Sequence, residues 1–154
     1  MANVKPIPDG YHAITPYLII DGAARAIEFY KAAFGATERF RFPTPNGKIG
    51  HAELQIGDSV IMLADESPEQ GARSPGRVGG SPVTLMLYVT NVDTTVDRAV
   101  TQGAVVKRAL ADQFYGDRTA TLEDPFGHQW HVATHIEDVP MAELESRAKA
   151  AHSG

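Results

Sequence analysis

The sequence contains no cysteine among its 154 residues. This absence excludes a disulfide framework, a thiolate nucleophile and a thiolate metal site, and it fits a reducing compartment. Apolar runs of the roughly 18 residues that a membrane span requires are also missing, and the start, MANVKPIPDGYH, lacks the apolar core of a signal peptide. We therefore expect a cytoplasmic protein without a membrane partner.

Positive charge is also scarce, because 14 Lys and Arg face 19 Asp and Glu, which gives a formal net charge of −5. A surface that follows nucleic acid needs clustered Lys and Arg, so the composition argues against a nucleic-acid partner. Phosphate-binding loops, dinucleotide-binding glycine motifs and the serine-elbow signature are absent. A neutral or cationic small ligand is easier to accommodate on such a chain.

One sequence pattern occurs twice in the chain. Residues 15–64 are echoed by residues 84–133, and Phe34-Gly35-Ala36 in the first copy matches Gln102-Gly103-Ala104 in the second. The repeat predicts a duplicated module. Two copies of a half-buried sheet can face each other, and the groove between them is the expected place for a ligand.

Periodicity assigns the same elements to both copies. Apolar residues at helical spacing before Gly35 predict the first helix, and a second helix is predicted between Asn91, its expected N-cap, and Gly103. One strand is expected before each helix and three after it. The strands are expected at 13–20, 37–42, 49–56, 59–64, 83–89, 105–109, 119–123 and 129–134.

Each module is therefore predicted to be βαβββ, and the chain a single α+β domain over residues 1–154. Modules 13–64 and 83–134 are expected to form a cupped, mostly antiparallel sheet around a central groove. Residues 65–82, rich in proline and glycine, would connect them as a linker or a lid. An amphipathic helix is expected at about 140–151. The exposed edges of a four-stranded half-sheet favour a homodimer.

Strand alternation divides the side chains between two faces of each sheet. A two-residue turn at Gly57-Asp58 would pair Glu53 with Met62 and Leu54 with Ile61. The apolar face with Leu54 should pack on the helices. The mixed face with Glu53 should line the groove.

Three residues expected on the groove side suit acid/base chemistry, namely His51, Glu53 and His131. Beside Met62 and Val60, Glu53 should have a raised pKa, and a carboxyl and an imidazole could then move a proton next to a carbonyl group. The same three side chains would suit Zn²⁺ or Ni²⁺. The alternative is structural, with these side chains hydrogen-bonded across a polar groove or facing water at a sheet edge.

The segment DQFYGDR, residues 112–118, also allows two interpretations. Gln113, Tyr115 and Arg118 could hydrogen-bond a ligand at the mouth of the groove. Alternatively, Gly116 supplies a turn in which Asp117 pairs with Arg118 or with a backbone amide.

Two motifs in this duplicated pattern, IEFYKAAFGA and LEDPFGHQWHV, resemble the vicinal oxygen chelate superfamily, to which glyoxalase I, extradiol dioxygenases and bleomycin-binding proteins belong. HAELQIGDSVIMLADE and DQFYGDR resemble a bacterial glyoxalase-like subgroup. The resemblance implies the fold described above and, for metal enzymes, one ligand on the first and last strand of each module. Here those positions correspond to Thr15, Met62, Thr84 and His131. Hydroxyls and a thioether are weak metal ligands, so the inherited metal site is expected to be lost.

We therefore expect a protein without a cofactor that binds a small, partly apolar or cationic molecule, similar to the bleomycin-binding members. Two alternatives stay open. One is a lyase or isomerase using Zn²⁺ or Ni²⁺ on His51, Glu53 and His131, and the other is a metal-free epimerase or dehydratase with Glu53 as base. The expected ligand contacts are Thr15, Tyr17, Met62, Thr84, Met86, Tyr88, Gln113, Tyr115, Arg118 and Gln129.

Overall fold

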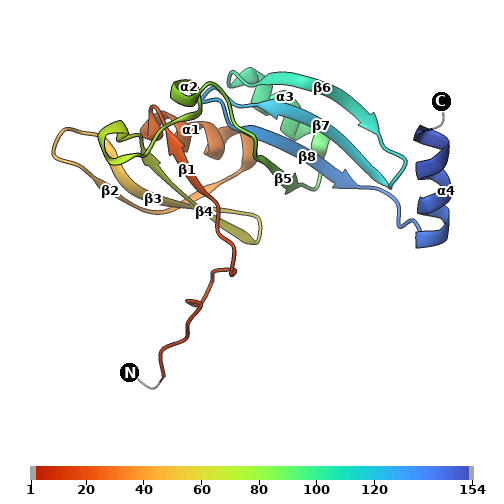
Figure 1. Cartoon of the computed structure of the whole chain (residues 1–154), viewed down its shortest axis with the longest axis horizontal. Coiled ribbons are helices and arrows are strands. Elements are labelled where there is room, and N and C mark those ends of the chain that lie inside the picture. Colours follow the sequence, from red (N-terminus) through yellow and green to blue (C-terminus); the bar gives the residue numbers. More distant parts are fainter. Residues whose placement is uncertain (1–2, 153–154) are drawn as a thin grey trace. The chain divides into compact units, whose positions relative to one another are not determined.

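The structure of the chain is a computed structural model that describes residues 3–152 (Figure 1). It is an α+β protein, as the sequence predicts, and its eight strands form two separate mixed sheets of four strands each. The chain divides into two compact units with their boundary between Ser81 and Pro82. We call them the first and the second unit, and each repeats the order βαβββ.

The sheet of the first unit has the strand order β1-β4-β3-β2. Strands β1 and β4 run parallel, whereas β4, β3 and β2 are antiparallel neighbours. The predicted hairpin register is confirmed, because Glu53 pairs with Met62 and Leu54 with Ile61. The elements of this unit are β1 (Tyr17–Ile20), α1 (Ala23–Phe34), β2 (Thr37–Pro43), β3 (Ile49–Ile56), β4 (Ser59–Asp65), the 3-10 helix η1 (Pro68–Gln70) and α2 (Pro75–Val78).

Helix α1 packs on one face of this sheet and provides much of the core (Figure 1). Ala26, Ile27 and Tyr30 are completely buried at helical spacing, and Leu54 on β3 is equally buried. Complete burial of a leucine or isoleucine side chain, such as Leu54 or Ile27, contributes roughly 1.5–3 kcal/mol. The helix ends at Gly35, as predicted, and the φ of 70° at Gly35 is the left-handed conformation that glycine adopts at the end of a helix.

Strand β1 is shorter than predicted, because it begins at Tyr17 and not at residue 13. Pro16 has no N–H to donate, but its carbonyl accepts a hydrogen bond from the Met62 amide at 2.9 Å. The predicted linker, residues 65–82, contains the two short helices η1 and α2. Glu66 accepts hydrogen bonds from Ser74 and Arg77, which fold residues 66–77 into a compact segment with η1 and α2.

The second unit has the order β5-β8-β7-β6, with β5 and β8 parallel. Helix α3 packs against β6, β7 and β8, and the predicted N-cap is confirmed because the Asn91 side chain accepts from the Thr94 amide at 3.1 Å. The elements are β5 (Thr84–Tyr88), α3 (Val92–Thr101), β6 (Val105–Asp112), β7 (Asp117–Glu123), β8 (Gln129–His135) and α4 (Met141–His152).

Helix α4 follows the last strand and keeps no buried residue. Arg147 joins it to the preceding chain by an ion pair with Glu137 and a hydrogen bond to the Phe114 carbonyl. Across residues 3–152, none of the helices combines the length and the apolar character needed to cross a membrane.

Candidate functional site

The candidate site lies on the face of the first sheet that α1 does not cover. Alternation puts Tyr17 of β1, His51 and Glu53 of β3, and Met62 of β4 on this face, because Glu53 and Tyr17 both pair with Met62. Strand β2 adds Phe42, which pairs with His51. We call this surface the open face of the first sheet.

A chain of hydrogen bonds crosses the open face. The Tyr17 hydroxyl lies 2.8 Å from His51 Nδ1, and His51 Nε2 lies 3.0 Å from Glu53 Oε2. The Tyr11 hydroxyl donates to the other carboxylate oxygen, Glu53 Oε1. An ionised carboxylate only accepts, so a neutral His51 ring must carry its hydrogen on Nε2 and accept from Tyr17 at Nδ1. Glu53 therefore selects the tautomer of His51.

Glu53 is 3% exposed, yet its pKa is lowered. Burial raises the pKa of this carboxyl, but the hydrogen bonds from Tyr11 and His51 and the nearby charge of Arg39, whose Nε lies 3.9 Å away, outweigh burial. The predicted raised pKa is therefore wrong. Sequence alternation correctly indicated apolar neighbours but could not reveal that Tyr11 and Arg39 reach the carboxylate.

His51 is also the centre of a strip of aromatic rings on the open face. Its ring centroid lies 5.4 Å from that of Tyr17 and 5.9 Å from that of Phe40, and Phe40 lies 5.2 Å from Phe42. Tyr17 and Phe42 are 47% and 62% exposed. We call these four residues the aromatic strip. It offers exposed ring surface to a ligand.

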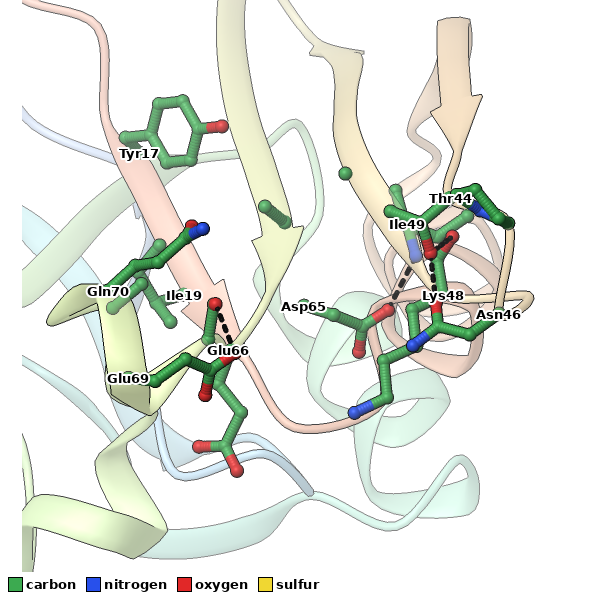
Figure 2. Close-up of a pocket in the computed structure, with 15 residues that line it drawn as sticks. Tyr17, Ile19, Thr44, Asn46, Lys48, Ile49, Asp65, Glu66, Glu69 and Gln70 are labelled. Carbon is green, nitrogen blue, oxygen red and sulfur yellow. Dashed lines mark hydrogen bonds between the residues drawn. The ribbon is translucent and has the colours of Figure 1, made fainter.

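A cavity of about 650 Å³ adjoins the strip at Tyr17 (Figure 2). Ile19, Ile49 and Ala64 give it an apolar floor on the sheet, and residues 44–48 between β2 and β3 form one wall. The linker after β4, including Ser67, forms another. Volumes of this size are typical of sites for small organic molecules.

Two carboxylates of the cavity wall are already occupied. Asp65 accepts from the amides of Gly22, Ala23 and Ile49 at 2.7–3.0 Å, and so it caps α1 from the end of β4. Arg77 and Ser74 hold the pKa of Glu66 down to about 2, Arg77 being the larger cause. Both side chains stabilise the walls. Lys48 and Glu69 are the other charged residues lining the cavity.

The remaining predicted residue of the first unit, Thr15, lies before β1, where its hydroxyl donates to the His12 carbonyl at 3.2 Å. In the second unit, Met86 and Tyr88 are exposed on β5, and Met86 pairs with His131. His131 Nδ1 is 2.8 Å from the Thr121 hydroxyl. Thr84 pairs with Gln129.

Tyr88 and Gln129 each bond within the second unit. Tyr88 donates to the buried Asp117, which also bonds His135, and Gln129 donates to Glu123 at 2.6 Å. His51 and Glu53 are thus brought together within one unit, whereas His131 belongs to the other.

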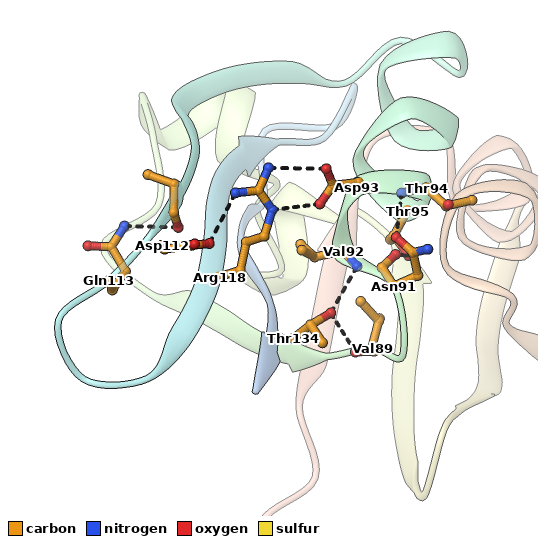
Figure 3. A network of polar contacts seen from close by, with 11 residues as sticks. Val89, Asn91, Val92, Asp93, Thr94, Thr95, Asp112, Gln113, Arg118 and Thr134 are labelled. Carbon is orange, nitrogen blue, oxygen red and sulfur yellow. Dashed lines mark hydrogen bonds and ion pairs between the residues drawn. The ribbon is translucent and has the colours of Figure 1, made fainter. Parts of the chain in front are cut away.

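Arg118 lies on the helix-facing side of its sheet, two residues before the buried Ala120 (Figure 3). Its guanidinium forms ion pairs with Asp93 of α3 and Asp112 of β6 at 2.8 and 3.1 Å. The predicted alternative, in which Asp117 pairs with Arg118, is wrong, because adjacent strand residues point to opposite faces of the sheet. Gln113 donates to the Thr119 hydroxyl at 3.1 Å, and Tyr115 packs edge-to-face on Phe114.

The four superfamily metal positions do not fit a divalent ion. Thr15 uses its hydroxyl on a carbonyl, Thr84 offers only a hydroxyl and Met62 only a thioether, so His131 is the one position of the four with a strong ligand. On the same face as Met62, both ring nitrogens of His51 are engaged by Tyr17 and Glu53. Among the residues that the structure describes, no group of three His, Asp or Glu side chains is arranged to hold a metal.

Comparison with known proteins identifies the family. Residues 11–132 match the model of the glyoxalase/bleomycin resistance protein/dioxygenase superfamily. An uncharacterised protein of Mycobacterium tuberculosis strain H37Rv is 42% identical over 155 residues, covering 99% of this chain and 88% of its own. An uncharacterised Arabidopsis thaliana protein is 30% identical over 115 residues, or 70% of this chain and 69% of its own.

Solved structures show the same fold. TioX from Micromonospora has a TM-score of 0.65 at 25% identity and covers 81% of this chain and 99% of its own. An Arabidopsis thaliana structure has a TM-score of 0.64 at 27% identity and covers 80% and 98%. The chain therefore belongs to the glyoxalase/bleomycin resistance protein/dioxygenase superfamily.

Proposed function

We propose that this protein binds a small planar aromatic molecule on the open face of its first sheet. The supporting observation is the aromatic strip of Tyr17, Phe40, Phe42 and His51, which is partly exposed and adjoins the cavity of about 650 Å³. Aromatic pairs contribute about 0.5–1.5 kcal/mol beyond the burial of their area. A ligand that contacts two rings of the strip would gain this twice.

The strip has features of a binding surface more than of a folding core. Phe42 keeps 62% of its surface exposed, so the fold gains little from it. Glu53 beside the strip is ionised at neutral pH because its pKa is lowered, and the positive charge of Arg39 lies 3.9 Å from it. The two charges offset each other, so an uncharged aromatic ring fits the strip.

Indole is a suitable first probe because it is planar, uncharged and soluble. Its titration into ¹⁵N-labelled protein should shift amide signals of β1, β2 and β3 around the strip. Phe42→Ala should weaken this binding about two- to tenfold, since it removes one ring contact. Val78→Ala is a matched control, because Val78 is similarly exposed, at 60%, but lies on α2.

Saturable shifts confined to the strip, weakened by Phe42→Ala but not by Val78→Ala, would support the proposal. It would be refuted by shifts of equal size across the chain, or by equal affinities of the wild type and the Phe42→Ala protein.

A second candidate function, metal-free acid/base catalysis, is favoured by the Tyr17, His51 and Glu53 hydrogen-bond chain. The lowered pKa of Glu53 makes this carboxylate a poor base, so His51 would be the general base. With hydrogen on Nε2, the ring can accept a proton at Nδ1, either directly or through the Tyr17 hydroxyl. Glu53 would then stabilise the imidazolium that forms.

Exchange of the enolisable hydrogens of indole-3-pyruvate in D₂O tests this candidate. We expect exchange faster than in buffer, and His51→Gln should return it to the buffer rate, while a control variant, Val78→Ala, should not. If the wild-type protein exchanges these hydrogens no faster than buffer although indole binds, the catalytic candidate is refuted and the binding proposal stands.

A further inference from the structure

The cavity beside the strip adds a second part to the proposed site. Tyr17 belongs to both, since its ring contacts that of His51 at a tilt, with 5.4 Å between the centroids, and it also lines the cavity next to Ile19. A ligand whose aromatic body lies on the strip can therefore extend a substituent past Tyr17. The chemistry of the cavity decides which substituent is bound.

Most of the charge in the cavity wall is already used by the fold. Asp65 satisfies three backbone amides, and Glu66 is neutralised by Arg77 at 2.7 Å. Neither carboxylate can turn to a ligand without exposing a helix end or releasing the linker.

Two opposite charges remain, one on each wall. Lys48 comes from the segment between β2 and β3, and within residues 3–152 its ammonium makes no side-chain hydrogen bond or ion pair, although its charge helps to lower the pKa of Glu69. Glu69 comes from η1 in the linker, where its backbone amide and the Ser67 hydroxyl lower its pKa, so it is ionised at neutral pH. Figure 2 shows Lys48 on the hairpin side and Glu69 on the linker side.

We propose that the cavity binds the ammonium and the carboxylate of a zwitterion, so that the ligand class is an aromatic α-amino acid or a close derivative. Lys48 would pair with the carboxylate and Glu69 with the ammonium. Thr44, Asn46 and Gln70 also line the cavity, and the side-chain amides of Asn46 and Gln70 would supply further hydrogen bonds. This inference rests on the proposed function, because it places the aromatic body on the strip.

Four indole probes separate the contributions. L-tryptophan carries both charges, tryptamine only the cation, indole-3-propionate only the anion, and 3-methylindole neither. We expect L-tryptophan to bind tightest in an NMR titration of the full chain. Each exposed ion pair should contribute about two- to fivefold in affinity.

Substitutions in the cavity then give opposite patterns. Lys48→Gln should weaken the binding of L-tryptophan and indole-3-propionate but not that of tryptamine. Glu69→Gln should weaken the binding of L-tryptophan and tryptamine but not that of indole-3-propionate. Lys48→Arg should restore binding. Glu28→Gln, on the exposed surface of α1, removes a charge of the same sign as Glu69→Gln and should change nothing.

The inference is overturned if L-tryptophan binds no tighter than 3-methylindole, if tryptamine binds tightest, or if neither cavity substitution changes the affinity for L-tryptophan. In each of these cases 3-methylindole would still bind, and Phe42→Ala would still weaken it, so the proposed function survives. If none of the four probes binds, the proposed function itself fails.

Discussion

Replacing Glu53 by Gln tests the electrostatics of the open face in detail. The wild-type carboxylate accepts from His51 Nε2 at 3.0 Å in a nearly buried position. A hydrogen bond to a charged group contributes about 1.5–3 kcal/mol and a neutral one about 0.5–1.5 kcal/mol, so weakening the His51 bond alone should cost about 1 kcal/mol of unfolding free energy. For a chain of this size that corresponds to a melting temperature lower by about 2–4 °C.

The substitution should also change the tautomer of His51. The Gln amide can donate to His51 Nε2, in which case the ring hydrogen moves to Nδ1 and is donated to the Tyr17 oxygen. Long-range ¹H–¹⁵N correlation spectra distinguish the two tautomers. If wild-type His51 carries its hydrogen on Nδ1, or if both proteins have the same tautomer, then Glu53 does not select the tautomer of His51.

The pH dependence of this stability difference follows from the lowered pKa of Glu53. A carboxyl whose pKa is lower in the folded state stabilises the fold above its unfolded pKa of about 4.3 and loses this contribution as the pH falls through the folded value. The wild-type protein should therefore have a higher free energy of unfolding than Glu53→Gln at pH 7, and this difference should disappear in acid. A difference that widens below pH 4 would contradict this assignment.

Three further predictions follow from other contacts. The pKa of His135 is raised by Asp117 and then Asp138, so the stability advantage over His135→Gln should be full below about pH 6.5 and disappear as the pH rises through the folded pKa, as denaturation at several pH values would show. Asp65→Ala should lower the unfolding free energy by about 2–4 kcal/mol in urea, because a helix cap and buried amides lose their acceptor; a loss below 0.5 kcal/mol, taken as roughly the size of a surface effect, would be inconsistent with this role. We also propose a homodimer, since β1 and β5 are edge strands of their sheets, and native mass spectrometry that finds only monomer at micromolar concentration would rule it out.

The fold could be predicted from sequence because its signals are local and repeated. Apolar spacing up to Gly35 predicted α1, and the turn at Gly57-Asp58 predicted the β3–β4 register. The predicted start of β1 is too early because the alternation of side chains continues through residues 13–16. Pro16 has no backbone N–H to donate to a neighbouring strand, and β1 begins after it.

The site was harder to predict because its key partners come from segments without periodicity. Alternation placed Tyr17, His51 and Glu53 on one face, but Tyr11 precedes the first strand and carries no pattern that points to Glu53. Phe42 was expected only as a strand residue. Its exposure, and the cavity formed by the linker, depend on packing that a linear pattern does not encode.

The most direct test of the account is where a bound aromatic molecule lies. Intermolecular nuclear Overhauser effects between indole and ¹³C-labelled protein report contacts with individual side chains. We predict cross-peaks to Tyr17, Phe42 and His51, with Ile19 as the neighbouring aliphatic contact. Cross-peaks found exclusively to other side chains of a saturated complex would contradict the claim that the open face of the first sheet is the binding site.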